Sequence, residues 1–178
     1  MSDNFGVAAC PCNAEIMITS LTLLILLLGS LLVFSAALVF IYRGRRGDEG
    51  ALRRGTNLAN WIVVAMCGIY LGFAFANPAH PDASVEIFFN GLLISLLILM
   101  RYHSVAQRLL LTSLLIGIHG LWDGLHLFSL PFANDLVPSW YALACAIFDL
   151  GYFGAASPIC LQILRAGRVV PSQSPQET

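Results

Sequence analysis

Five long apolar runs limit the fold of this chain more than any other feature of its sequence. They cover residues 16–42, 57–76, 85–100, 109–128 and 139–164. Runs of this kind are typical of transmembrane α-helices, since a helix of about 20 apolar residues crosses a bilayer. Composition agrees, because 58% of the 178 residues are hydrophobic and only 11% are charged, whereas soluble domains are about 25% charged. The sequence therefore predicts an all-α, polytopic membrane protein with five transmembrane helices.

The segments that join these runs are short, which favours antiparallel packing of neighbouring helices in one bundle over residues 16–164. Residues 1–15 are mostly polar and are predicted to form an extracytoplasmic N-terminal segment. Residues 165–178 are rich in Pro, Ser and Gln, a composition that predicts a disordered cytoplasmic tail.

The distribution of arginine predicts the orientation of the bundle. All nine basic residues are arginine, and they lie only in segments 43–56, 101–108 and 165–178. Five spans place these three segments on the same side. Because positive residues are retained in the cytoplasm, the N-terminus is predicted outside and the C-terminus inside, in the inner (plasma) membrane of a bacterial-type cell. The absence of lysine excludes Schiff-base chemistry on the chain.

The fourth run carries an unusual polar face between Ile118 and Phe128. His119, Asp123 and His126 are spaced i, i+4 and i+7, so they share one helix face with Trp122. Ionisable residues are expensive within a bilayer and usually face the interior of a bundle or a wet cavity. This face is therefore the main candidate for a functional site.

The fifth run repeats the pattern with Tyr141, Cys145 and Asp149 at four-residue spacing. If the fourth and fifth helices are antiparallel, Asp149 lies near the depth of His119, Cys145 near Asp123 and Tyr141 near His126. The third run adds Glu86 and Asn90, and the second adds Tyr70. These residues predict a pocket in the outer half of the membrane, lined by Asn90, Trp122, Tyr141 and Cys145.

A metal site is one interpretation of this pocket. His119 and His126 lie about 10 Å apart along the helix axis, too far apart for one ion. The candidate ligands are therefore His119, Asp123 and Asp149, a set that suits zinc or iron. A zinc ion at this position would activate water for hydrolysis, with His119, Asp123, His126 and Asp149 as the candidate catalytic residues.

Three other interpretations remain open. In a proton relay, Asp123 bridges the imidazoles of His119 and His126, as intramembrane Asp/His chains do in pumps. In a structural subunit, Asp123 and Asp149 are buried polar residues that only fix helix packing. A small transporter or sensor is a further reading. The expected surroundings are the lipid bilayer and a lipid-like small molecule from the outer leaflet, and a net charge of −1 gives no case for nucleic acid.

Two G-x-x-x-G units, Gly68-Gly72 and Gly120-Gly124, favour close approach of helices in a membrane. On the fourth helix, Gly117, Gly120 and Gly124 flank the His/Asp face. Close packing along this flank would direct the polar face into the bundle.

The site residues together form an H-x-x-W-D-x-x-H helix followed by P-x-x-Y and C-x-x-x-D, which here are His119, Trp122, Asp123, His126, Pro138, Tyr141, Cys145 and Asp149. In this pattern the chain resembles a family of small bacterial multi-pass membrane proteins of unknown function. The resemblance supports the choice of residues and implies no activity. More distantly, the His/Asp content is similar to that of zinc-containing membrane amidases of the alkaline ceramidase type, which implies metal-assisted hydrolysis as one candidate chemistry.

Overall fold

The computed structural model describes residues 12–128 and 136–166, and within these residues every regular element is helical. The elements are α1 (Cys12–Arg45), α2 (Glu49–Ala76), α3 (Ala83–Leu99), the short 3-10 helix η1 (Met100–Tyr102), α4 (Val105–Leu127) and α5 (Ser139–Arg165). All five α-helices are long and apolar enough to cross a membrane, so the predicted all-α fold with five candidate spans is confirmed. The expectations for the outermost N-terminal residues and for most of the C-terminal tail lie outside the described residues.

Four of the helices begin before their apolar runs, and in α2 and α4 the start is fixed by a capping residue rather than by hydrophobicity. α2 begins at Glu49 and not near residue 57, since Asp48 accepts a hydrogen bond from the backbone N–H of Ala51 at 2.8 Å. α4 begins at Val105 and not near residue 109, since Ser104 and Gln107 form a capping box. Gly47, with φ of 101°, closes the turn between α1 and α2. The arginine-rich segment between the first two runs is thus largely helical.

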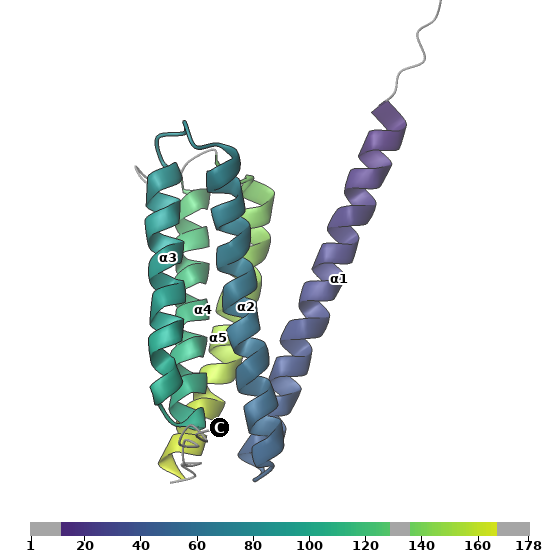
Figure 1. The fold of residues 1–178 in the computed structure, drawn as a ribbon. Helices are drawn as coiled ribbons and strands as arrows, with labels where there is room; N and C mark the ends of the chain where they lie inside the picture. The colour runs from purple at the N-terminus through teal and green to yellow at the C-terminus, as the bar shows by residue number, and fades with distance from the viewer. Residues whose placement is uncertain (1–11, 129–135, 167–178) are drawn as a thin grey trace, which may run out of the picture.

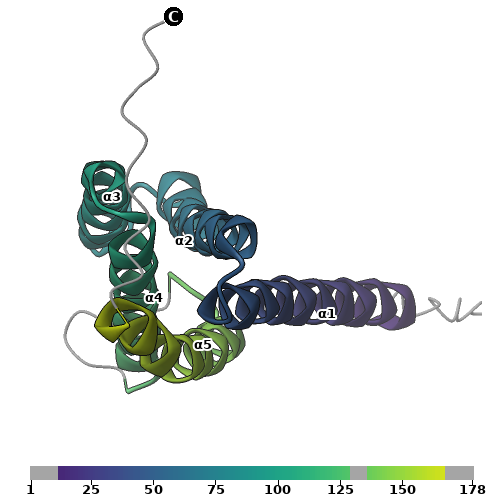
Figure 2. The same ribbon diagram turned by 90° about the horizontal axis from the view of Figure 1, so that it is seen from below.

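Helices α2 to α5 run side by side as a compact bundle, and α1 joins it only through its C-terminal half (Figure 1). Seen along the bundle, α1 leads away from the other four helices (Figure 2). The contact of α1 with α5 centres on Phe34, which stacks on Phe148 and meets the ring edge of Tyr152, with centroid separations of 5.7 and 5.4 Å. α1 therefore has a fixed end and a diverging end.

The bundle holds a group of buried polar residues within a largely apolar interior, and its exterior is also apolar. Glu86, Asn90, His119 and Asp123 are completely buried. Large apolar side chains cover the exterior, among them Leu32, Trp61, Phe88, Leu121 and Ile147, each more than 60% exposed. A water-soluble domain would instead cover its exterior mainly with polar and charged side chains. The surface matches a hydrocarbon environment, in which the buried polar groups must find their partners within the protein.

Only part of the predicted glycine packing is present. A Cβ on Gly120 would lie 2.8 Å from Cβ of Asp149, and a Cβ on Gly117 would lie 2.7 Å from the ring of Phe153, so both glycines allow α4 to approach α5 closely. Gly124, Gly68 and Gly72 have no heavy atom of the described residues within 4 Å of that position. Within the described part of the chain, the Gly68-Gly72 unit is therefore not a packing surface.

Candidate functional site

The buried carboxylate and imidazole side chains gather in the half of the bundle where α2 ends and where α3 and α5 begin. Tyr70 comes from α2, Glu86 and Asn90 from α3, Asp149 from α5, and His119, Trp122, Asp123 and His126 from α4. They form two hydrogen-bonded groups. We call His119, Asp123 and Asp149 the triad, and Glu86, Asn90, Trp122 and His126 the glutamate cluster.

The triad joins α4 and α5 around one imidazole nitrogen. Nδ1 of His119 lies 3.2 Å from Oδ2 of Asp123, one turn along the same helix, and 3.1 Å from Oδ2 of Asp149 on the neighbouring helix. All three side chains are almost completely inaccessible to solvent. The predicted antiparallel alignment, with Asp149 at the depth of His119, is therefore present.

Tyr70 fixes the far side of the triad. Its hydroxyl donates a hydrogen bond to Oδ1 of Asp123, the carboxylate oxygen that faces away from His119. Its ring also meets the His119 ring edge to face, with centroids 4.9 Å apart. A carboxylate whose second oxygen is held in this way has a fixed orientation, as is usual for the outer hydrogen-bond partners of metal ligands.

The other nitrogen of His119 has no such support. Nε2 is buried and has no hydrogen-bond partner among the described residues. An unpaired buried polar atom costs about 1–3 kcal/mol. The site therefore keeps an unsatisfied buried nitrogen, which a purely structural role would not require.

The donor set and its spacing fit a divalent metal ion. One ligand atom from each triad residue lies within 4.8 Å of the others. Ligands held at about 2.0–2.2 Å by a tetrahedral zinc lie about 3.3–3.6 Å from each other, close to the distances around Nδ1. Two carboxylates with a neutral imidazole carry two negative charges, which one divalent cation would cancel. Without a cation, the buried carboxylates must share protons with their neighbours.

The glutamate cluster joins α3 to α4. Oε1 of Glu86 lies 2.8 Å from Nε2 of His126, while Oε2 accepts hydrogen bonds from Nε1 of Trp122 at 3.2 Å and from Nδ2 of Asn90 at 3.1 Å. The indole of Trp122 also stacks on Phe89, with centroids 4.2 Å apart. Glu86 therefore accepts hydrogen bonds from Trp122 and Asn90 and also contacts His126.

The tautomer of His126 follows from its surroundings. Nδ1 lies 2.9 Å from the backbone carbonyl of Trp122, an acceptor only, so Nδ1 carries a proton. The short contact between Nε2 and Glu86 then requires one further proton, held either by the imidazole or by the carboxyl group. Glu86 and His126 therefore share a proton.

This geometry corrects the predicted relay. Both ring nitrogens of His126 have partners other than Asp123, so Asp123 does not bridge the imidazoles of His119 and His126. Asp123 does not form this bridge because Glu86, from helix α3, is the partner of Nε2 of His126. His126 belongs to the glutamate cluster, and the triad consists of the three residues predicted as metal ligands.

The predicted pocket-lining residues divide between two places. Asn90 and Trp122 hold Glu86. Tyr141 and Cys145 line instead a cleft of about 590 Å³ between α1, α2 and α5, which also reaches Asp149. This cleft was not expected from the sequence, because its existence depends on the divergence of α1.

Two residues matter more than their sequence pattern indicated. Glu86 and Tyr70 were recognised as polar residues of the outer half but were not included among the candidate catalytic or metal-binding residues. The signal for Glu86 is a carboxylate one turn from Asn90 in an otherwise apolar run. Tyr70 has no distinctive signal, since tyrosine is common in membrane helices.

Comparison with protein-family models, with curated proteins and with solved structures finds no match to this chain. The resemblance to a family of small bacterial membrane proteins therefore stays a prediction. The functional argument rests on the residues and geometry of the chain itself.

Proposed function

We propose that this protein is a multi-pass membrane protein with an intramembrane metal centre, in which His119, Asp123 and Asp149 bind one zinc or iron ion. One observation carries the proposal: three potential ligand atoms of these residues lie within 4.8 Å of one another in a fully buried position. Nitrogen and oxygen donors of this kind suit both metals.

A centre with three protein ligands leaves a coordination position for water or substrate, as catalytic zinc sites do. A bound ion of this type activates water for hydrolysis, which is the reaction class we propose. The hydrogen bond from Tyr70 to Asp123 supports the assignment, because it holds one ligand in place from outside the centre.

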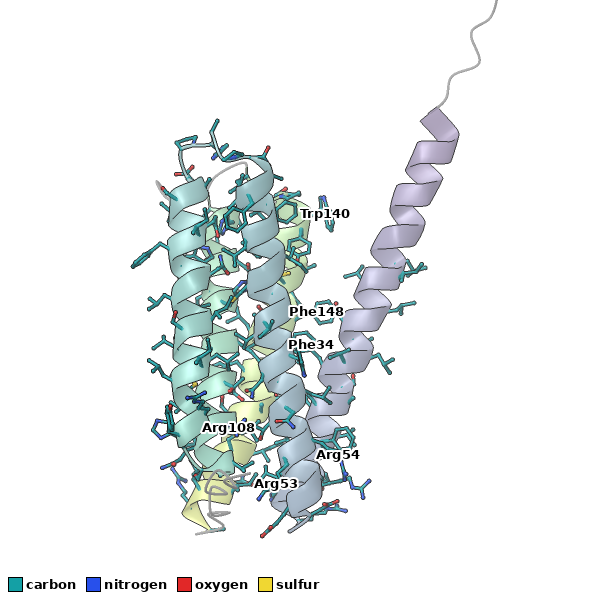
Figure 3. The ribbon with its side chains drawn as sticks, viewed as in Figure 1. Phe34, Arg53, Arg54, Arg108, Trp140 and Phe148 are labelled. Atoms are coloured by element: carbon teal, nitrogen blue, oxygen red, sulfur yellow. The ribbon has the colours of Figure 1, made fainter. Side chains whose placement is uncertain are left out.

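The proposed orientation places the metal centre in the outer half of the plasma membrane. Arg53, Arg54 and Arg108 lie at one end of the bundle, and Trp140 lies toward the opposite end (Figure 3). Retention of arginine in the cytoplasm supports an external N-terminus and a cytoplasmic C-terminus. The triad lies in the half of the bundle nearer Trp140.

Elemental analysis of the detergent-purified protein tests the proposal. Wild-type protein should contain about one zinc or iron ion per chain. Asp149→Asn should lose the metal, because the amide keeps the shape of the carboxylate but removes a charged ligand. Glu86→Gln is the matched control, since it changes a buried carboxylate of the glutamate cluster, and it should retain the metal. A metal-free wild type, or equal metal in Asp149→Asn, would overturn the proposal.

A structural role is the second candidate, favoured by the hydrogen bonds from Tyr70 to Asp123 and from Trp122 to Glu86 across helix interfaces. Under this reading the buried polar residues only fix the register of the bundle. It predicts a metal-free wild type and a loss of stability in both Asp149→Asn and Glu86→Gln.

A further inference from the structure

A cleft of about 590 Å³ opens between α1, α2 and α5 on the side of the bundle from which α1 diverges. Its walls come from all three helices and include Gly29 and Val33 of α1, Trp61 and Ala65 of α2, and Cys145 and Asp149 of α5. Phe34 and Phe148, which stack where α1 meets α5, lie at its closed end (Figure 3). We call this cleft the α1 groove.

The α1 groove leads from the apolar exterior to the triad. Trp61 and Ile25, which line it, are 69% and 61% exposed, so the groove is open to whatever surrounds the bundle. Asp149 lines the same groove and is bonded through its carboxylate to His119. With Tyr141 and Cys145 it forms a polar edge along α5, four residues apart at each step. The groove is therefore apolar along α1 and α2 and polar toward the triad.

The size and lining of the α1 groove favour an acyl chain as its occupant. Ligand sites usually have volumes of about 300–1,000 Å³, a range that includes this groove. Its lining is mostly apolar, with Tyr141, Cys145 and Asp149 along one edge on α5. A hydrocarbon chain that ends in a polar group matches this arrangement.

We propose that the α1 groove binds an acyl chain of a membrane lipid, with the polar head of that lipid directed toward Tyr141, Cys145 and Asp149. Such an amphiphile matches an apolar groove with one polar edge. The position of the headgroup rests on the proposed metal centre, whereas binding of the chain does not. The lipid is thereby the class of molecule that the centre would act on.

Photo-crosslinking tests the proposal with a phospholipid that carries a diazirine in its acyl chain. The full-length protein is reconstituted in nanodiscs with this lipid, irradiated, and mapped by peptide mass spectrometry. Labelling should concentrate on the parts of α2 and α5 that line the α1 groove. Uniform labelling around the five helices, or linkage of α1 to a second copy, would overturn the proposal.

Filling the groove supplies the decisive comparison. Gly29→Phe should abolish the concentrated labelling, because no heavy atom of the described residues lies within 4 Å of a Cβ at Gly29 and the new ring has space to occupy the groove. Gly91→Phe on α3 is the matched control, since that position is equally open but lies outside the groove, and it should leave labelling unchanged. Val33→Trp gives a second groove-filling variant. Unchanged labelling in both groove variants would contradict the proposal.

The proposed metal centre and the proposed acyl-chain site can be tested independently, because two variants affect them differently. Asp149→Asn should keep the acyl-chain labelling even though it loses the metal, and Gly29→Phe should keep the metal even though it loses the labelling. Loss of labelling in Asp149→Asn would mean that the chain is not held by the α1 groove itself.

Discussion

Asp149 connects the main features of the site at the scale of single residues. Its carboxylate contacts His119 on one side and lines the α1 groove on the other. Asp123 does not line the groove, and Tyr70 donates a hydrogen bond to its second oxygen. The two carboxylates of the triad therefore have different surroundings, and Asp149 is the one that a ligand in the groove can approach.

Tyr70→Phe should weaken metal binding by about tenfold, because outer hydrogen-bond partners of metal ligands contribute about 10–100-fold in affinity. The substitution removes the hydroxyl donor to Asp123 and keeps the ring against His119. Competition with a chelator of known affinity measures the change. Tyr152→Phe is the control, since Tyr152 is buried against Phe34 rather than in the triad. Equal affinities of the two variants would contradict a supporting role for Tyr70.

Glu86→Leu should lower the free energy of unfolding by about 1–3 kcal/mol, because it leaves the buried donors of Trp122 and Asn90 without their carboxylate acceptor. Glu86→Gln should be less damaging, since its amide still offers an acceptor and a donor to these neighbours and to His126. Unfolding in detergent, followed by circular dichroism, measures both. A leucine variant as stable as the glutamine variant would show that the glutamate cluster adds nothing to packing.

Some of these residue contacts could be predicted from the sequence. Antiparallel α4 and α5 are neighbours in the chain, so helix rise alone placed Asp149 beside His119. The partner of His126 could not be predicted in this way. It depends on the rotation of α3 about its own axis, which follows from the packing of Phe89 on Trp122 rather than from any periodicity in the sequence.

At the scale of helices, the approach of α4 to α5 sets the geometry of the triad. Gly120 allows this approach, since any Cβ there would meet the Cβ of Asp149. The neighbouring glycine of the same motif, Gly124, faces open space. A G-x-x-x-G unit read from sequence does not reveal which of its glycines makes the contact, because that depends on the crossing point of the two helices.

Gly120→Ala should destabilise the protein by about 1–3 kcal/mol, since the added methyl group forces α4 and α5 apart. It should also reduce the metal content, because Asp149 is the residue displaced. Gly124→Ala should change stability by no more than about 0.5 kcal/mol. Thermal unfolding in detergent and elemental analysis measure the two effects. Equal behaviour of the alanine variants would contradict close packing at Gly120.

The divergence of α1 was beyond prediction for a similar reason. Its sequence is apolar around the whole circumference, so no stripe indicates which face contacts the bundle. The contact is made by aromatic packing of Phe34 on Phe148 and Tyr152, near the middle of the helix. C-terminal to Phe34, α1 also packs against α2, where Gly55 lies close to Ile41. The α1 groove lies on the N-terminal side of these contacts, where α1 diverges.

At the scale of the whole molecule, the buried polar residues and the apolar exterior are complementary features of one fold. The buried carboxylates and imidazoles contact one another inside, while Leu32, Phe88 and Ile147 face outward. The apolar exterior was the part of the fold most accessible to sequence, because it follows from composition and from the length of the apolar runs alone.

The proposed orientation is a prediction for the whole molecule. Alkaline phosphatase fused after Asp82, between α2 and α3, should be active, because the proposed orientation places that turn outside the cell. The same enzyme fused after Gly50, in the arginine-rich segment, should be inactive. Expression levels of the two fusions are compared by immunoblot. The reverse pattern would place the triad in the cytoplasmic half of the membrane.

X-ray absorption at the metal edge of the purified protein tests the central claim most directly. We predict a first shell of nitrogen and oxygen ligands at about 2.0–2.2 Å, from His119, Asp123 and Asp149 with water. The signal should disappear in Asp149→Asn. A sulfur shell at about 2.3 Å would indicate cysteine ligands instead. The absence of any metal edge would contradict the metal centre and leave the triad with a structural role only.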